Sequence, residues 1–183
     1  MKRAAELRKL SDHHHRGLVQ ARWLRRAAAG EEANPPEEAA EAFLEFWQEV
    51  TTAHFREEEE VLLPVVARHE GDLLGREPVV EMLVQHARIR GLVMELSDEV
   101  RDGAVKPETL RSIGELLEAH IRLEEREVFP MVEETLSEEA LEEVASRLAV
   151  KDAGSRTEPW VPMESLSYDP WPRPGDSEGG DWS

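Results

Sequence analysis

The sequence contains no cysteine, which excludes disulfides, thiolate metal sites and cysteine nucleophiles. It lacks any stretch near the roughly 18 consecutive apolar residues of a membrane-spanning helix, and its start, MKRAAELRKL, lacks the apolar core of a secretory signal. Basic residues are few, with 22 Lys and Arg against 40 Asp and Glu and a formal charge of −18. Because nucleic acids and anionic membranes repel such a charge, we expect neither as a partner and predict a cytoplasmic protein.

Helix-forming residues dominate the chain from residue 2 to about 150, which is rich in Ala, Leu, Glu and Arg. Glycine followed by proline interrupts this composition near residues 30, 72 and 103, as expected where one helix stops and the next begins. The predicted helices cover residues 3–29, 36–68, 78–101 and 107–134. Short connections make neighbouring helices antiparallel, so we predict an all-α fold, an up-down-up-down four-helix bundle.

A shorter fifth helix is predicted at about 137–149, with Ser137 as its cap and acidic residues in its first turn. The following segment, 151–183, contains five of the eleven prolines and three of the five tryptophans. We therefore predict a domain over residues 1–150 and an irregular, flexible tail over 151–183. Two roles remain open for the tail, docking of a Trp on the bundle or binding of a partner protein.

One phrase occurs twice, as HFREEEEVLLPVV from His54 and as HIRLEEREVFPMV from His120. Both copies have a Glu four residues after the His, at Glu58 and Glu124, and a Pro ten residues after it. At helical spacing each His and its Glu fall in the middle of an apolar stripe. His86 lies on the apolar stripe of the predicted third helix in the same way. Each Pro is expected to end or kink its helix beyond this level.

The predicted first helix has three adjacent histidines, and spacing selects one of them. His14 has Leu10 four residues before it and Leu18 four residues after it. His13 and His15 have polar residues or glycine at most of the corresponding positions. Only His14 therefore lies on the apolar face, and each of the four helices directs one His inward.

Buried carboxylates need a compensating charge, because an unpaired carboxylate in a bundle core costs several kcal/mol or takes up a proton. No Lys or Arg lies on the stripes at this level, and a single His and Glu one turn apart would be only a hydrogen-bonded pair. Two such pairs with two further histidines predict a metal site instead. Six ligands exceed one tetrahedral zinc, so two ions are implied, most simply a di-iron pair, with zinc or manganese as alternatives. The predicted ligands are His14, His54, Glu58, His86, His120 and Glu124.

Four motifs between about residues 5 and 135, DHHHRGLV, HFREEEEVLLP, QHARIRGLV and HIRLEEREVFP, resemble the hemerythrin-like family of His-His-Glu cation-binding domains. The resemblance implies a four-helix bundle with two non-haem iron ions joined by an oxo or hydroxo bridge. It also implies that Glu58 and Glu124 bridge the ions and that the centre binds dioxygen or another small oxidant, for sensing, storage or scavenging.

Two positions depart from the oxygen-carrying hemerythrins. Arg90 stands where they have a second histidine, and Glu125 stands where they have an aspartate. Loss of a nitrogen ligand opens a coordination position, so an enzyme that turns over peroxide or nitric oxide is a second hypothesis. A metal-free helical interaction module, with an acidic surface and a Trp-bearing tail, is a third.

Other glutamates in the repeated phrase fall off the apolar stripes. We expect them to face solvent, although one or two could accept hydrogen bonds from ligand histidines. These residues are Glu57, Glu59, Glu60, Glu125 and Glu127.

Overall fold

The computed structural model describes residues 4–31 and 35–155, and this part of the chain is helical without any strand. None of its helices is both long and apolar enough to cross a membrane. The helices are α1 (Arg8–Ala28), α2 (Pro36–Phe46), α3 (Thr52–Glu57), α4 (Leu63–His69), α5 (Glu77–Asp102), α6 (Pro107–Leu123), α7 (Phe129–Thr135) and α8 (Glu138–Ser155). The 3-10 segments Ala5–Leu7 and Gly71–Gly75 precede α1 and α5.

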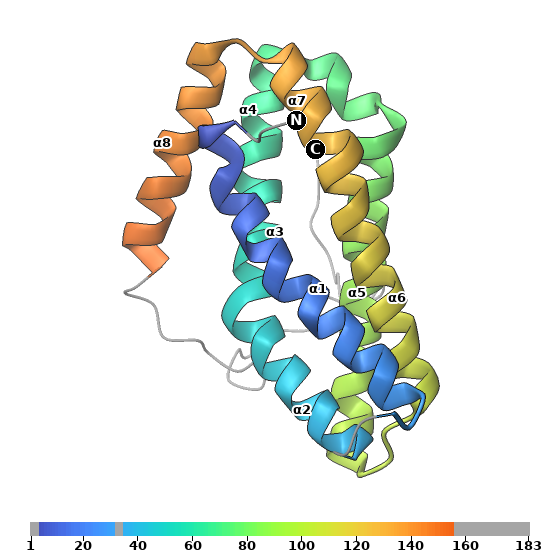
Figure 1. Cartoon of the computed structure of the whole chain (residues 1–183). Coiled ribbons are helices and arrows are strands. Elements are labelled where there is room, and N and C mark those ends of the chain that lie inside the picture. The colour runs from blue at the N-terminus through green and yellow to red at the C-terminus, as the bar shows by residue number, and fades with distance from the viewer. Residues whose placement is uncertain (1–3, 32–34, 156–183) are drawn as a thin grey trace, which may run out of the picture.

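The helices join into long rods that lie side by side (Figure 1). The first rod is α1 and the third is α5. The second combines α2, α3 and α4, and the fourth combines α6 and α7, through π-helical turns of five residues. The turns are Trp47–Thr51, Glu58–Leu62 and Glu124–Val128. The rods agree closely with the predicted helix ranges, because caps and prolines marked their ends.

Pro64 and Pro130 do not end their helices, because both rods continue to His69 and Thr135; the alternative, a kink at each proline, stays a prediction. A π turn precedes each proline. The N–H of Leu63 donates to the carbonyl of Glu58, five residues earlier, and the second copy of the phrase repeats this bond. The wider turn accommodates a residue that has no N–H and whose ring would clash with an α-helical carbonyl.

Polar residues separate two apolar clusters along the bundle. One cluster contains Leu10, Leu62, Met82 and Phe129, and the other contains residues such as Phe43 from the opposite end. The inward His of α1 and of α5 lies between residues of these two clusters, and in the other two rods the inward Glu does. The bundle interior therefore has one polar layer with apolar packing on both sides.

The fifth helix packs beside the bundle, where α8 contacts α4 and the turn before α1. Ser137 caps it as predicted, since its Oγ accepts a hydrogen bond from the N–H of Ala140 at 3.3 Å. α8 runs to Ser155, beyond the predicted end at 149 and across the predicted start of the tail at 151. Residues 156–183, including the three tail tryptophans, lie outside the described residues, so the expectations for the tail remain predictions.

The closest packing in the bundle joins α1 and α6. A Cβ atom on Gly114 would lie 2.7 Å from the carbonyl oxygen of Ala21, and one on Gly17 would lie 2.7 Å from a side-chain carbon of Ile121. On α5, in contrast, a Cβ atom on Gly91 would meet no atom within 4 Å. The first two glycines therefore permit close helix packing, and Gly91 has no such role within the described chain.

We predict that Gly114→Ala destabilises the protein by about 1–3 kcal/mol, because a backbone carbonyl cannot move aside as a flexible side chain can. Gly91→Ala is the matched control, at a position inside a helix that is open in the single chain, and should leave the stability of the monomer unchanged or raise it by up to about 1 kcal/mol. Urea unfolding of both variants measures the difference. Equal stability of the two variants would contradict the close approach of α1 and α6.

Candidate metal centre

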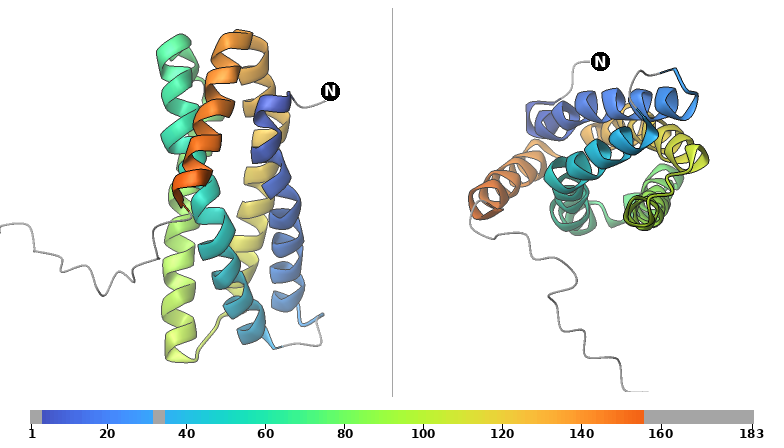
Figure 2. Two further views of the ribbon diagram at one scale, coloured as in Figure 1. Left: turned by 90° about the vertical axis from the view of Figure 1, so that its left-hand side faces the viewer. Right: turned by 90° about the horizontal axis from the view of Figure 1, so that it is seen from below.

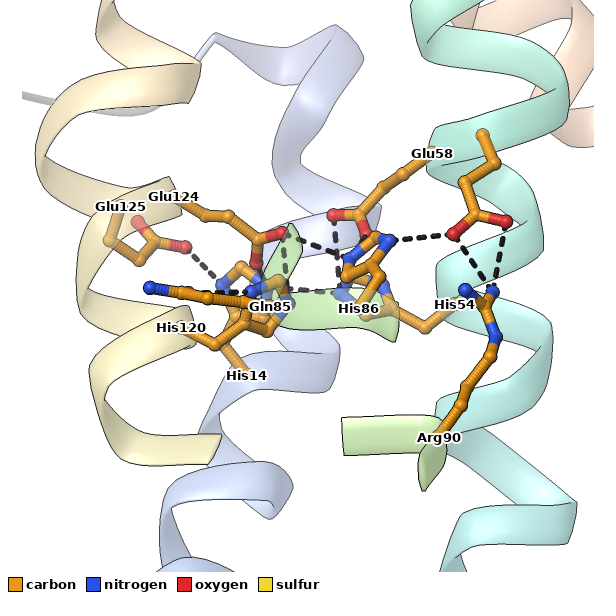
Figure 3. Close-up of polar contacts among 10 residues, drawn as sticks. His14, His54, Glu58, Gln85, His86, Arg90, His120, Glu124 and Glu125 are labelled. Atoms are coloured by element: carbon orange, nitrogen blue, oxygen red, sulfur yellow. Dashed lines mark hydrogen bonds and ion pairs between the residues drawn. The ribbon is translucent and has the colours of Figure 1, made fainter. Parts of the chain in front are cut away.

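All six residues predicted as ligands meet in the polar layer of the bundle, and each is at most 4% exposed (Figure 3). Their ligand atoms form two groups, each lying within 4.8 Å of one another. His14 and His54 belong to the first group, His86 and His120 to the second, and both glutamates belong to both. The structure therefore places two carboxylates between two pairs of imidazoles.

Each carboxylate reaches histidines of both groups through Nε2. Glu124 lies 3.0 Å from His14 and 3.0 Å from His120, and Glu58 lies 3.3 Å from His54 and 3.3 Å from His86. The Nε2 atoms of His14 and His54 face each other at 3.0 Å. Such a convergence of nitrogen and oxygen donors is the arrangement that two closely spaced cations require.

The outward nitrogens of three histidines are held by acceptors from other helices. Nδ1 of His86 lies 2.7 Å from Glu59, Nδ1 of His14 lies 2.6 Å from Glu125, and Nδ1 of His120 lies 3.3 Å from the Gln85 side-chain oxygen. In a neutral imidazole, an acceptor at Nδ1 places the proton there, which leaves Nε2 with a lone pair directed toward the centre.

The expectation that the remaining glutamates face solvent is wrong for one of them, Glu57. Glu59 and Glu125 hold ligand histidines, which is the alternative named above, and Glu57 is buried at 4% exposure with Lys9 Nζ 2.6 Å away. Glu60 and Glu127 are exposed as expected. Helical spacing within one segment of the sequence could not reveal these contacts, because each contact joins residues of different rods.

Further side chains support the acceptors. Arg90 donates to Glu59 at 2.9 Å, and Ser11 Oγ donates to Glu125 at 2.6 Å. The guanidinium of Arg90 also lies 5.3 Å from the ring centre of Phe55, which stacks on His86 at 3.7 Å. Figure 3 shows Arg90 at the edge of the group, where its guanidinium pairs with Glu59. Arg90 therefore supports the histidine layer from outside and contributes no ligand atom.

Gln85 and Phe55 were not identified from the sequence as part of the site. The only available signal was their position next to His86 and His54, and adjacency alone does not distinguish a contact from an unrelated face of the helix.

Several buried polar atoms of the centre form no regular hydrogen bond within the described chain. Both oxygens of Glu58 and Glu124, and Nε2 of His86 and His120, have no hydrogen-bond partner of regular geometry among the described residues. Buried oxygen and nitrogen acceptors without donors are costly. Cations bound between them would satisfy all of these atoms at once.

Comparison with known families agrees with this arrangement. Residues 6–132 match the hemerythrin HHE cation binding domain. This chain belongs to the hemerythrin HHE family. The match spans the chain from the turn before α1 into α7 and includes all six residues of the centre. No curated protein and no solved structure matches the chain.

A third group in the HHE domain borders the centre, formed by His13, His54 and Glu57. It shares His54 with the first group, and His13 is partly exposed and lies edge to face with the His54 ring at 5.4 Å. His13 therefore lies next to the six residues but outside both four-residue groups.

Without metal, burial and nearby charges shift the pKa values of the two buried carboxyls in opposite directions. Burial, followed by the nearby charge of Glu124, raises the pKa of Glu58 to about 8. Burial also acts to raise the pKa of Glu124, but His120, His14 and His86 outweigh it and hold this pKa well below its usual range. Without metal, one of the two carboxyls therefore keeps a proton near neutral pH.

The four histidines of the centre form two pairs, whose pKa values shift in opposite directions. Burial lowers the pKa of His14 and of His86, but bonds to glutamates overcome it and raise both to about 9. Burial dominates at His54 and His120 and lowers their pKa. The metal-free centre therefore compensates its carboxylates with protons on Glu58, His14 and His86.

We predict that the metal-free protein loses stability as pH rises from about 6.5 to 9. Glu58, His14 and His86 have folded-state pKa values above their unfolded values, so the folded state holds more protons in this range and stability falls with pH. The expected loss is at least about 2 kcal/mol in the free energy of unfolding.

Urea unfolding of the chelated protein at several pH values measures this loss. The metal-loaded protein is the control and should not follow the same trend, because cations replace the protons. A metal-free protein that is equally stable at pH 6.5 and pH 9 would contradict the buried charge arrangement.

Proposed function

We propose that this HHE domain holds two iron ions and binds dioxygen or a related small oxidant for sensing, storage or scavenging. In this proposal His14 and His54 hold one ion and His86 and His120 hold the other. Glu58 and Glu124 bridge the two, as supported by their membership of both ligand groups. The fold we propose is the up-down-up-down four-helix bundle, supported by the course of the four rods in Figures 1 and 2.

Iron is favoured by the donor set and its setting. Imidazole and carboxylate donors at the centre of a helix bundle are the recurring environment of di-iron sites, and the chain has no thiolate to direct selection toward other metals. Two zinc or two manganese ions fit the same donor types. When bound, two iron ions supply the electrons that a small oxidant accepts on binding.

The size of a small cavity beside the centre limits which ligand can bind. Its volume is about 20 Å³, and three ligand histidines, His14, His54 and His120, line it together with apolar side chains that include Leu117 and Phe55. A cavity of this size holds about one water molecule. The proposed ligand is therefore a molecule of two or three atoms, and larger organic substrates do not fit.

The surrounding residues would keep this ligand in a defined environment. Glu59, Glu125 and Gln85 hold the Nδ1 protons of three histidines, so each imidazole keeps its orientation. The two apolar clusters exclude water from both sides of the polar layer. Such an environment suits reversible binding of a small neutral oxidant.

We predict that anaerobic loading with ferrous ion gives about two iron ions per chain, as the two ligand groups require. His14→Ala should weaken loading by tenfold or more, because it removes a ligand atom. His13→Ala is the matched control in the adjacent position and should keep about two ions. Iron analysis after removal of free metal measures all three proteins.

Fewer than about one iron per wild-type chain would reject the di-iron proposal. Such a result would leave the zinc or manganese pair and the metal-free interaction module. Equal loss of iron in both variants would mean that the ligand on α1 is misassigned.

Exposure of the loaded protein to oxygen tests binding against turnover. A near-ultraviolet absorption that appears with oxygen and disappears with reductant, over repeated cycles, is the expected result for a binding protein. Sustained consumption of peroxide or nitric oxide that is lost in His120→Ala would instead establish the enzyme hypothesis.

We predict that Leu117→Phe slows the reaction of the iron-loaded protein with oxygen by about tenfold or more, since the larger ring fills a cavity that holds about one water molecule. Iron content should stay unchanged. Leu44→Phe, a partly buried leucine of the same apolar cluster, is the control and should react like the wild type. Stopped-flow absorption measures the rates, and an unchanged rate in Leu117→Phe would exclude this cavity as the ligand site.

A further inference from the structure

α5 has an apolar face that points away from the bundle. Val80, Val84 and Met94 are 46%, 44% and 65% exposed, and Ala87 and Gly91 between them are also exposed. Steps of four, three, four and three residues place these five positions along one side of the helix. The opposite side of α5 is also apolar and packs in the core, through residues such as Met82 and Ile89.

The position of α5 leaves this outer face uncovered by the described chain. Seen end on, α5 forms one corner of the bundle (Figure 2). An open groove runs beside the face between α5 and α6, lined by Arg88, Gly91, Leu92 and Glu95 on α5 and by α6 residues such as Leu116. Apolar surface that is continuous on an otherwise charged protein is typical of an interaction site.

Gly91 is the least explained residue of the face. Glycine inside a helix costs about 1 kcal/mol relative to alanine, and no atom of the described chain lies near enough to require it. Gly17 and Gly114, in contrast, each permit close contact between α1 and α6. By the same physical reasoning Gly91 suits close approach of another helix from outside.

The charges of Arg88 and Glu95, before and after Gly91, would be complementary to those of a second, antiparallel copy of the same helix. With 100° per residue, Arg88 and Glu95 lie on one side of the line through Gly91, and Ala87 and Met94 lie on the other. In an antiparallel pair related by a two-fold axis, each side meets the same side of the second helix at the opposite height. Arg88 then meets Glu95 of the second copy, and Ala87 meets Met94 of the second copy.

We propose that the outer face of α5 binds a second copy of this chain, with the two α5 helices crossing antiparallel at Gly91. Arg88 has no ion pair in the described part of the chain, although acids outnumber bases 40 to 22. Glu95 lies 3.6 Å from Lys106 Nζ, with both side chains half-exposed. Each dimer therefore gains two Arg88–Glu95 pairs and two Met94–Ala87 contacts, independently of the metal.

Charge reversal tests this arrangement in the full-length protein. Arg88→Glu and Glu95→Arg each place like charges opposite one another, so each should weaken dimerisation by about tenfold. The double variant Arg88→Glu/Glu95→Arg restores opposite charges and should recover the wild-type dimer. Sedimentation velocity over a concentration series at about 0.15 M salt measures association, because this ionic strength screens the net negative charge beyond about 8 Å.

Two further variants distinguish the effect of close helix contact at Gly91 from the effect of a change in charge. Gly91→Leu should abolish dimerisation while iron content and helicity stay unchanged, since its side chain enters open space in the monomer. Arg147→Glu on α8 makes the same charge change away from the face and should dimerise like the wild type. A monomer at all concentrations, a dimer insensitive to Gly91→Leu, or a double variant that does not recover would each overturn the proposal.

Discussion

Burial of two carboxylates among four imidazoles is the constraint on which the rest of this protein depends. Glu58 and Glu124 are completely buried, and in an apolar interior their charge requires compensation. Protons on Glu58, His14 and His86 provide it without metal, and cations would provide it in the loaded protein. Two apolar clusters on either side of this layer supply the packing that keeps the polar residues together.

The repeated phrase builds this layer twice, with one difference between the halves. Each copy supplies a His, a Glu that belongs to both groups of candidate ligands and, in the next position, a Glu that holds a histidine of another rod. A π turn before the proline closes each copy, and π turns are frequent at functional sites. The two glutamates that hold histidines have different partners, however. The Ser11 hydroxyl donates to Glu125, and the Arg90 guanidinium donates to Glu59. The two groups of candidate ligands therefore have unequal electrostatic surroundings.

The same helix serves the interior and the surface of the protein. One side of α5 carries His86 and the core residues around it, and the other side carries the exposed stripe that crosses Gly91. Because these faces point in opposite directions, association through α5 would leave the ligand atoms untouched. The proposed binding of a small oxidant and the proposed association of two chains would therefore use different faces of one helix.

The helical period alone determined the inward residues of this protein. Spacing within single helices selected His14 over its neighbours and paired His54 with Glu58, because a buried stripe repeats along one chain segment. Only the tertiary structure decided which acid holds which histidine. Glu125 meets His14 across 111 residues and Glu59 meets His86 across 27, and such contacts depend on the rotation and height of neighbouring rods. The π turns at Pro64 and Pro130 were equally hidden, since proline forbids the α-helical bond and only the packed bundle shows that a wider turn replaces it.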